Sequence, residues 1–340
     1  MSSLGRLGIC LLNISEARNY EVIERVAKAA TTRASGEGPQ HLSSVLNIFQ
    51  DIDYNRSVLT IAAPISHLKS AVCGACREAY RLIDLSSQEG VHPRLGSVDL
   101  IPVYPLSATV SLQECGTIAR SIAEYLSDNI QGTSFFLFGA ADLPQCRSLV
   151  PRRKAVGWFR GKSGIDWSKF THDFGARPSS RYGLTGVGAS HYVTNCNVTI
   201  DTQDLEAGRE IATAIRATSA GGLPGVQAMA FPHEGRVEIA CNVDSIDQKS
   251  TNLASSGGND AADQGGRGEK IAQEDTPIVL DYTPPDVIEQ RVRELAVEKQ
   301  IELVGTALVG FRPEQAWKVA MEALKTGQDQ FWKTRNILRM

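Results

Sequence analysis

The chain has no long apolar run, although 42% of its 340 residues are apolar. No stretch approaches the roughly 18 consecutive apolar residues that a membrane-spanning helix needs. The first apolar run, Leu7–Leu12, is followed at once by the polar Asn13-Ile-Ser-Glu16. That run is too short for a secretory signal and has no processing site. The sequence therefore predicts a cytoplasmic protein with no membrane partner.

The chain also lacks a strong charge of either sign. Its net charge is −3 and its pI is about 6.1, so no basic footprint indicates a nucleic-acid partner. An RNA-binding alternative, suggested by the order of predicted elements, lacks the K/R-G-F/Y-x-F/Y strand typical of that class. The expected partners are small molecules.

Paired cysteines and metal-ligand spacings are missing as well. The seven cysteines are odd in number and scattered, which indicates reduced thiols in a chain without a signal. Cys73-Gly-Ala-Cys76 falls within an apolar helical stripe, and no second CxxC motif completes a zinc site. We interpret the pair as core packing and expect no metal.

Strand and helix patterns alternate in the same order twice. The first cycle occupies residues 1–185 and the second residues 186–330, each in the order βαββαβ of a ferredoxin-like unit. We expect an α+β fold with two ferredoxin-like subdomains and a ligand cleft between them. The predicted strands are 7–14, 41–52, 56–63, 98–103, 134–139, 192–200, 226–231, 236–243 and 301–309, and the predicted helices are 19–30, 66–84, 111–127, 204–217, 283–300 and 313–324.

Three segments interrupt this pattern. Residues 247–276 contain five glycines and almost no apolar side chains, so they are predicted to be a flexible insertion. Gly183-Leu-Thr-Gly-Val-Gly-Ala189 is not a dinucleotide motif, and we interpret it as a glycine-rich crossing that approaches a ligand closely. The basic run Arg152-Arg-Lys154 is either a solvated surface or an attractor for a polyanionic small molecule.

The loop Gly90-Val-His-Pro-Arg-Leu-Gly-Ser-Val-Asp99 presents a histidine next to a strand. Pro93 favours an extended backbone at His92, and Arg94 places a cation two residues away. Such an imidazole exchanges protons near neutral pH, and such a guanidinium holds a carboxylate. Asp51 and Asp53, at a predicted hairpin turn, either serve turn chemistry or supply a carboxylate that supports His92.

Nearly the whole chain resembles the formiminotransferase domain of the glutamate formiminotransferase–cyclodeaminase family. Its sharpest motif, H-P-R-x-G-x-x-D, is similar to residues 92–99 here. The other similar segments are Asn13-Ile-Ser-Glu-Ala-Arg-Asn19, Asn55-Arg-Ser57, Ala79-Tyr-Arg-Leu-Ile-Asp84, Asp173-Phe-Gly175, Gly183-x-Thr-x-x-Gly-Ala189, Val226-Gln-Ala228 and Val304-Gly-x-x-Leu-Val-Gly310. The helical cyclodeaminase domain has no counterpart in this sequence.

The resemblance implies two α/β subdomains with a folate site between them. It implies transfer of the formimino group from N-formimino-L-glutamate to N5 of tetrahydrofolate, which acts as co-substrate. It also implies a homodimer, because members are often dimers. The implied catalytic residue is His92, and the implied folate or substrate contacts are Asp53, Arg94, Gly139 and the loop residues Gly175, Pro178, Ser179, Ser180, Arg181, Tyr182 and Gly183.

The local chemistry suits that reaction. One imidazole, His92, can take the proton from N5 after attack and deliver it to the departing glutamate nitrogen, an effect worth about 10²–10⁴-fold. Arg94 can bind a substrate carboxylate bidentately.

Two departures from the family pattern leave alternatives open. Phe138-Gly-Ala-Ala-Asp142 replaces Y-G-E-A-A, and Gly221-Gly-Leu-Pro-Gly225 replaces a segment rich in lysine and arginine. The alternatives are formyl exchange between 5-formyltetrahydrofolate and glutamate, and a folate-binding protein that has lost transfer.

Overall fold

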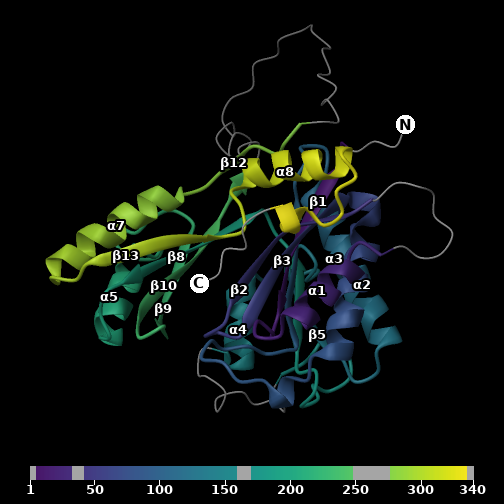
Figure 1. Ribbon diagram of the computed structural model, residues 1–340, viewed down its shortest axis with the longest axis horizontal. Coiled ribbons are helices and arrows are strands. Elements are labelled where there is room, and N and C mark those ends of the chain that lie inside the picture. Colours follow the sequence, from purple (N-terminus) through teal and green to yellow (C-terminus); the bar gives the residue numbers. More distant parts are fainter. Residues whose placement is uncertain (1–4, 33–41, 159–169, 248–275, 335–340) are drawn as a thin grey trace, which may run out of the picture.

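The computed structural model describes residues 5–32, 42–158, 170–247 and 276–334. Its strands form a seven-stranded sheet, a four-stranded sheet and a two-stranded ribbon within those ranges. Figure 1 shows the larger sheet with its helices in one part of the molecule, and the smaller sheet reaching away from it. The mixed α and β composition confirms the expected α+β class.

The first sheet has the strand order β2-β3-β1-β4-β7-β5-β6. Strands β2, β3, β1 and β4 are mutually antiparallel neighbours, whereas β7 runs parallel to both β4 and β5. The strands are β1 (Leu7–Ile14), β2 (Ser44–Asp51), β3 (Arg56–Pro64), β4 (Val98–Pro105), β5 (Ser134–Gly139), β6 (Phe174–Gly175) and β7 (Thr185–Ala189).

Both faces of this sheet are covered, which explains why β1 is apolar at nearly every position. Cys10, Leu12 and Ile14 point into a core shared with the helices of the first unit. The alternating Leu7, Ile9 and Leu11 enter a second core on the opposite face. The helices of this unit are α1 (Tyr20–Ala29), α2 (Ile65–Leu82), α3 (Leu112–Asn129) and α4 (Leu149–Val156), with the short 3₁₀ turn η1 (Leu85–Ser87) after α2.

The second sheet has the order β13-β8-β10-β9, and all its neighbours are antiparallel. Helices α5 and α7 close an apolar core against one face of this sheet, as Figure 1 shows. The elements are β8 (Val193–Ile200), α5 (Leu205–Ile215), β9 (Val226–His233), β10 (Arg236–Asp244), α7 (Pro285–Glu298) and β13 (Leu303–Val309), with the ribbon β11 (Ile246–Asp247) and β12 (Leu280–Asp281) between β10 and α7.

The last helix crosses back to the first unit. Helix α8 (Pro313–Lys325) and the 3₁₀ turn η4 (Phe331–Thr334) pack against β2, and α8 also packs against β3. Ala316, Ala320 and Phe331 share the core of Leu7, Ile9 and Leu11. The sequence pattern places this helix in the second cycle, but its apolar stripe covers the first sheet.

The glycine-rich segment at 183–189 contributes β7, an interior strand of the first sheet. A Cβ at Gly186 would lie 2.7 Å from the ring of Phe136, and one at Gly188 would lie 2.4 Å from the carbonyl oxygen of Phe138. These glycines therefore leave room for the phenylalanine rings and the backbone of the neighbouring strand β5.

Other predictions have clear outcomes. Cys73 and Cys76 lie in the middle of α2 and are buried, and burial raises the pKa of both thiols, which confirms the core-packing interpretation. The predicted flexible insertion, residues 247–276, lies outside the described residues except at its two ends. Within the part of the chain described, no helix combines the length and apolar character needed to cross a bilayer.

Candidate active site

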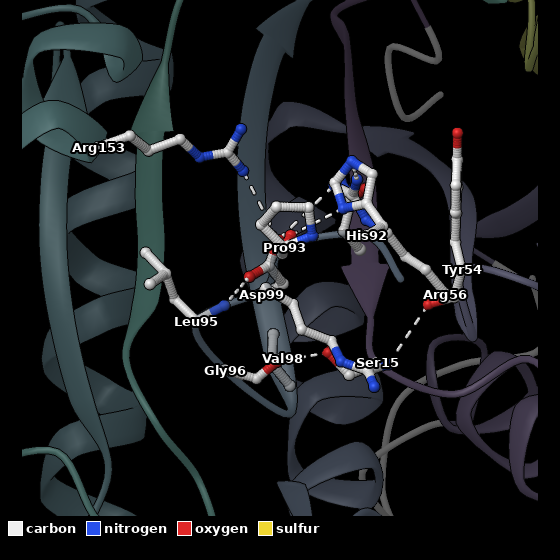
Figure 2. Close-up of polar contacts among 12 residues, drawn as sticks. Ser15, Tyr54, Arg56, His92, Pro93, Leu95, Gly96, Val98, Asp99 and Arg153 are labelled. Atoms are coloured by element: carbon white, nitrogen blue, oxygen red, sulfur yellow. Dashed lines mark hydrogen bonds and ion pairs between the residues drawn. The ribbon is translucent and has the colours of Figure 1, made fainter. Parts of the chain in front are cut away.

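The loop that carries His92 is fixed by the strand that follows it. Asp99, in β4, accepts a hydrogen bond from the backbone N–H of Leu95 at 2.7 Å. Gly90 lies so close to the β2–β3 turn that a Cβ there would be 2.3 Å from the carbonyl oxygen of Tyr54. The His92 backbone therefore has a rigid mount, as Figure 2 shows for the turn around Pro93 and Asp99.

The His92 ring lies where the two units meet. Its exposed fraction is 8%. Its centroid is 5.0 Å from the ring of Tyr54, 5.0 Å from that of Phe231 and 5.8 Å from that of Trp158. Tyr54 follows β2 in the first unit and Phe231 belongs to β9 in the second. The junction position agrees with the expectation, but aromatic rings cover the imidazole.

Hydrogen bonding fixes the tautomer of this imidazole. Nδ1 lies 2.7 Å from the carbonyl oxygen of Pro93, which can only accept, so Nδ1 carries the proton. Nε2 lies 3.4 Å from Nη1 of Arg56 and keeps its lone pair. Burial, with the charges of Arg56, Arg153 and Arg94, holds the pKa of His92 well below its ordinary value. The ring is a neutral proton acceptor at Nε2.

Guanidinium groups surround this histidine. Arg56 and Arg153 each place an Nη2 atom 3.6 Å from Oδ2 of Asp99, and Figure 2 shows them on opposite sides of that carboxylate. The guanidinium of Arg153 also lies 4.7 Å from the centroid of Trp158. Burial lowers the pKa of Arg153 to about 10. Arg94 donates from Nη1 to the carbonyl oxygen of Asn55 at 2.8 Å.

The two aspartates of the hairpin turn do not touch His92. Oδ2 of Asp53 accepts from the backbone N–H of Glu234 at 3.1 Å. Oδ2 of Asp51 lies 3.0 Å from Nε2 of His233, and Oδ1 accepts from the N–H of Tyr54 at 2.8 Å. Within the described residues, no carboxylate contacts the His92 ring.

His233, in contrast, lies between carboxylates from both units. Its Nδ1 is 3.9 Å from Oε2 of Glu238, and its ring centroid is 4.8 Å from that of Tyr54. Burial alone would lower the pKa of His233. The hydrogen bond to Asp51 and the charges of Glu238 and Asp51 outweigh burial and raise this pKa to about 9. Oε1 of Glu238 accepts from the Tyr54 hydroxyl at 2.8 Å and from Asn197 Nδ2 at 2.9 Å. Burial raises the pKa of Glu238.

The expected folate loop lies directly against the His92 loop. Ser97 donates its N–H to the carbonyl oxygen of Tyr182 at 2.9 Å, and Leu184 donates to Leu95 at 2.8 Å. The ring of Tyr182 packs on Tyr80, 5.4 Å away, and Arg181 is exposed beside it. Ser179 caps the turn by accepting from the N–H of Tyr182, Ser180 is exposed, and Pro178 is half-buried.

The three predicted site glycines have backbone conformations that only glycine adopts easily. Gly139, Gly175 and Gly183 have φ values of 59°, 83° and 67°. A Cβ at any of them would lie within 2.0 to 2.2 Å of a backbone oxygen. Each position thus has a structural reason for glycine that is independent of ligand.

A surface hollow lies beside this region. It has a volume of about 520 Å³ and is formed by polar residues of the β1–α1, β2–β3 and η1 loops. None of the predicted site residues lines it. Its lining residues are Glu16, Arg18, Asn19, Tyr20, Asn55, Ser87, Gln88 and Glu89.

Sequence reasoning missed several groups at this site. Arg56 and Asp99 stand in quoted motifs without an assigned role, and Arg153 stands in the basic run. Their positions in motifs were the available signal. His233 and Glu238 gave no signal, because only the packing of β9 and β10 against the first unit brings them to Tyr54.

A neutral imidazole thus lies among cations at the junction of two α/β units. The family model described as "Formiminotransferase domain, N-terminal subdomain" matches residues 7–190, a range that ends with β7 of the first sheet. The chain belongs to the formiminotransferase family.

Curated relatives agree with this membership. A formiminotransferase cyclodeaminase-like protein of Arabidopsis thaliana is 33% identical over 307 residues, which span 84% of this chain and 96% of that protein. A glutamate formimidoyltransferase of Thermoplasma acidophilum is 29% identical over 238 residues, 69% of this chain and 75% of that protein. The formimidoyltransferase-cyclodeaminase of Gallus gallus is 25% identical over 94% of this chain and 52% of that protein.

Proposed function

We propose that the protein transfers the formimino group of N-formimino-L-glutamate to N5 of tetrahydrofolate, with His92 as general base and then general acid. The observation that carries the proposal is the neutral His92 ring, whose Nε2 keeps a lone pair at the junction of the units. Membership of the formiminotransferase family supports the reaction, and tetrahydrofolate is its co-substrate.

The reaction needs one proton to move between two nitrogens. The N5 lone pair attacks the formimino carbon, and a carbon–nitrogen bond forms. Attack makes N5–H acidic, and Nε2 of His92 takes this proton. The imidazolium returns it to the glutamate nitrogen as the original carbon–nitrogen bond breaks and L-glutamate leaves. Holding both substrates in register supplies much of the remaining acceleration.

Substrates reach the imidazole only when the rings over it separate. Phe231 comes from the second unit, so a rotation of the units that opens their junction exposes Nε2. Reclosure around the substrates then excludes water from the reacting carbon.

The finer assignments belong to the same proposal. The units, residues 1–185 and 186–330 by sequence, are ferredoxin-like, with β2-β3-β1-β4 and β13-β8-β10-β9 as supporting strand orders. The folate lies between them along Gly139 and the loop Gly175–Gly183, and Asp53 and Arg94 contact the substrates. A cytoplasmic homodimer is the proposed working form.

A coupled assay tests the transfer. Purified protein is mixed with N-formimino-L-glutamate and tetrahydrofolate, and folate absorbance and released glutamate are followed together. The proposal predicts equal amounts of formimino-folate and glutamate. Absence of both products, with folate bound, would contradict the proposal.

One other function is carried by specific observations. The covered His92 ring and the altered segment Phe138–Asp142 favour a folate-binding protein without transfer. In that case wild type and His92→Asn bind folate equally and neither turns over. Formyl exchange between 5-formyltetrahydrofolate and glutamate is the variant reaction, which the same assay detects with that donor.

A further inference from the structure

The arginines around His92 have hydrogen-bond donors that nothing satisfies. Nε of Arg56, Nε of Arg153, and both Nε and Nη2 of Arg94 are buried without an acceptor among the described residues. Oδ2 of Asp99 also lacks a hydrogen bond, because both neighbouring Nη2 atoms stop at 3.6 Å. The ion pairs leave these N–H groups without acceptors, although Nη1 of Arg94 donates to Asn55 and Nη1 of Arg56 faces Nε2 of His92.

Other arginines of the same region are fully engaged, which makes this cluster distinctive. Arg152, the neighbour of Arg153 in α4, donates to the carbonyl oxygen of Leu137 at 2.9 Å and pairs with Asp173. Arg147 donates twice to Asp142, at 2.7 and 2.8 Å. Exposure does not explain the difference, since Arg153 is only 8% exposed.

Burial of guanidinium N–H groups without acceptors is unfavourable, and here both Arg56 and Arg153 face the single carboxylate of Asp99. An anionic ligand relieves both deficits at once. A carboxylate fits best, because the guanidinium fork presents parallel N–H donors to its two oxygens. The location narrows the choice further, since Nη1 of Arg56 lies 3.4 Å from Nε2 of His92.

We propose that Arg56 and Arg153 bind a substrate carboxylate next to His92, and that Asp99 is the positioning residue that holds the two guanidinium groups apart. The inference rests on the proposed function, because it assigns the carboxylate to a substrate of that reaction. The carboxylate comes from the amino-acid donor or from the glutamyl tail of the folate.

Binding of a carboxylate also changes the proton affinity of His92. The negative charge offsets the cations that hold the pKa of His92 down, and it draws Arg56 away from Nε2. The imidazole then becomes a stronger base when the substrate is present. The charged and titratable groups that face the ring or its neighbours are Arg56, Arg94, Arg153, Asp99 and Tyr54, with Glu238 and His233 beyond the tyrosine.

A cycle of ligand and protein changes tests the site without turnover. N-formyl-L-glutamate and its two monoamides are titrated calorimetrically into wild type, Arg153→Gln, Arg153→Lys and the control Arg293→Gln. Arg293 is an exposed arginine of α7 that pairs with Glu289. A parallel arm compares 5-formyltetrahydrofolate with the analogue that lacks the glutamyl tail.

In wild type, one amide replacement or loss of the tail weakens binding about 10- to 100-fold, as expected for a charge-assisted pair. In Arg153→Gln the same ligand change has little effect, Arg153→Lys retains part of it, and Arg293→Gln behaves as wild type. If an amide replacement weakens binding, the arginines hold a carboxylate of the amino-acid donor. If removal of the glutamyl tail weakens binding, they hold a carboxylate of the folate.

The possible failures are distinct. If both ligands bind wild type but no ligand change couples to Arg153, the carboxylate site is overturned and the transfer proposal stands. If neither ligand binds wild type, the proposed function fails and the site fails with it. Should Arg153→Gln unfold, Arg56→Gln takes its place in the same calorimetric titrations. In wild type, ligand binding should also raise the pKa of His92.

Discussion

Two buried histidines pack against the ring of one tyrosine, yet one is neutral and the other is positively charged. The rings of His92 and His233 lie 5.0 and 4.8 Å from that of Tyr54. Their exposed fractions are 8% and 2%. Guanidinium groups surround His92 and favour its neutral form, whereas Asp51 and Glu238 favour the imidazolium of His233. Similar burial thus gives opposite results, because the sign of the neighbouring charges decides.

The difference separates two roles at the junction of the units. His92 carries its proton on Nδ1, so its Nε2, which faces Nη1 of Arg56 at 3.4 Å, can accept a proton. His233 already holds its proton and joins Asp51 of β2 to Glu238 of β10. The first histidine is suited to chemistry, and the second holds the units together beside it.

The largest expected effect follows from removal of the base. His92→Asn should lower kcat of formimino transfer about 10²- to 10⁴-fold, because no other neutral base replaces Nε2. Folate affinity should change little. His67→Asn, at a partly exposed histidine of α2 whose Nδ1 lies 2.9 Å from the Ser66 hydroxyl, is the matched control. Steady-state kinetics and folate titration measure both quantities, and an unchanged kcat would remove His92 from the mechanism.

Next in size is the loss of a carboxylate beside His233. Asp51→Asn should lower the free energy of unfolding by about 3 kcal/mol, because it removes one partner of a buried charged pair. Asp53→Asn, two residues away in the same turn, should change it by less than about 0.5 kcal/mol. Urea denaturation of the two variants measures the contrast. Equal effects would mean that His233 is not a buried imidazolium.

The pH dependence of stability should have one limb from each histidine. The raised pKa of His233 gives stability that is fully present below its unfolded pKa and is lost as pH rises through about 9. The depressed pKa of His92 gives stability that is present above its unfolded pKa and is lost as pH falls below it.

The alkaline limb should be worth about 1–3 kcal/mol. His233→Gln should flatten the alkaline limb alone, and His92→Asn the acid limb alone. Unfolding free energies between pH 5 and 10, roughly the range that spans both transitions, test the assignment. The same limb lost in both variants would contradict it.

The smallest expected effect concerns the tyrosine between the histidines. Tyr54→Phe keeps the ring but removes its hydrogen bond to Glu238, so stability should fall by about 1 kcal/mol. Asn197 still donates to the same oxygen, which limits the loss. Thermal unfolding measures the change, with Tyr20→Phe at an exposed tyrosine as control. A loss well above that size would show that the hydroxyl holds more than this carboxylate.

The sequence predicted most of the elements because their patterns are local. The strand expected at residues 7–14 has the bounds of β1, and the helices at α1, α2, α3, α5 and α8 differ from prediction by one or two residues at most ends. His92 was predicted because its motif is contiguous. The junction position of its ring was also expected.

The rest depended on contacts between distant segments. Asp51 and Asp53 look equivalent in the sequence, yet only Asp51 faces His233, because Asp51 ends β2 whereas Asp53 lies in the turn that follows it. Glycines 186 and 188 were interpreted from the sequence as a close approach to a ligand. The structure shows a packing reason for them, because a Cβ at either position would collide with Phe136 or Phe138 of β5. The pairing of Arg153 with Asp99 joins residues on α4 and β4, and no local pattern encodes it.

The different charge states of the two histidines can be observed directly by ¹⁵N NMR of the labelled imidazoles. At neutral pH His92 should be neutral with its proton on Nδ1, and His233 should carry protons on both nitrogens. An imidazolium signal from His92, or a proton on its Nε2, would contradict the account, because no lone pair would then face the substrates.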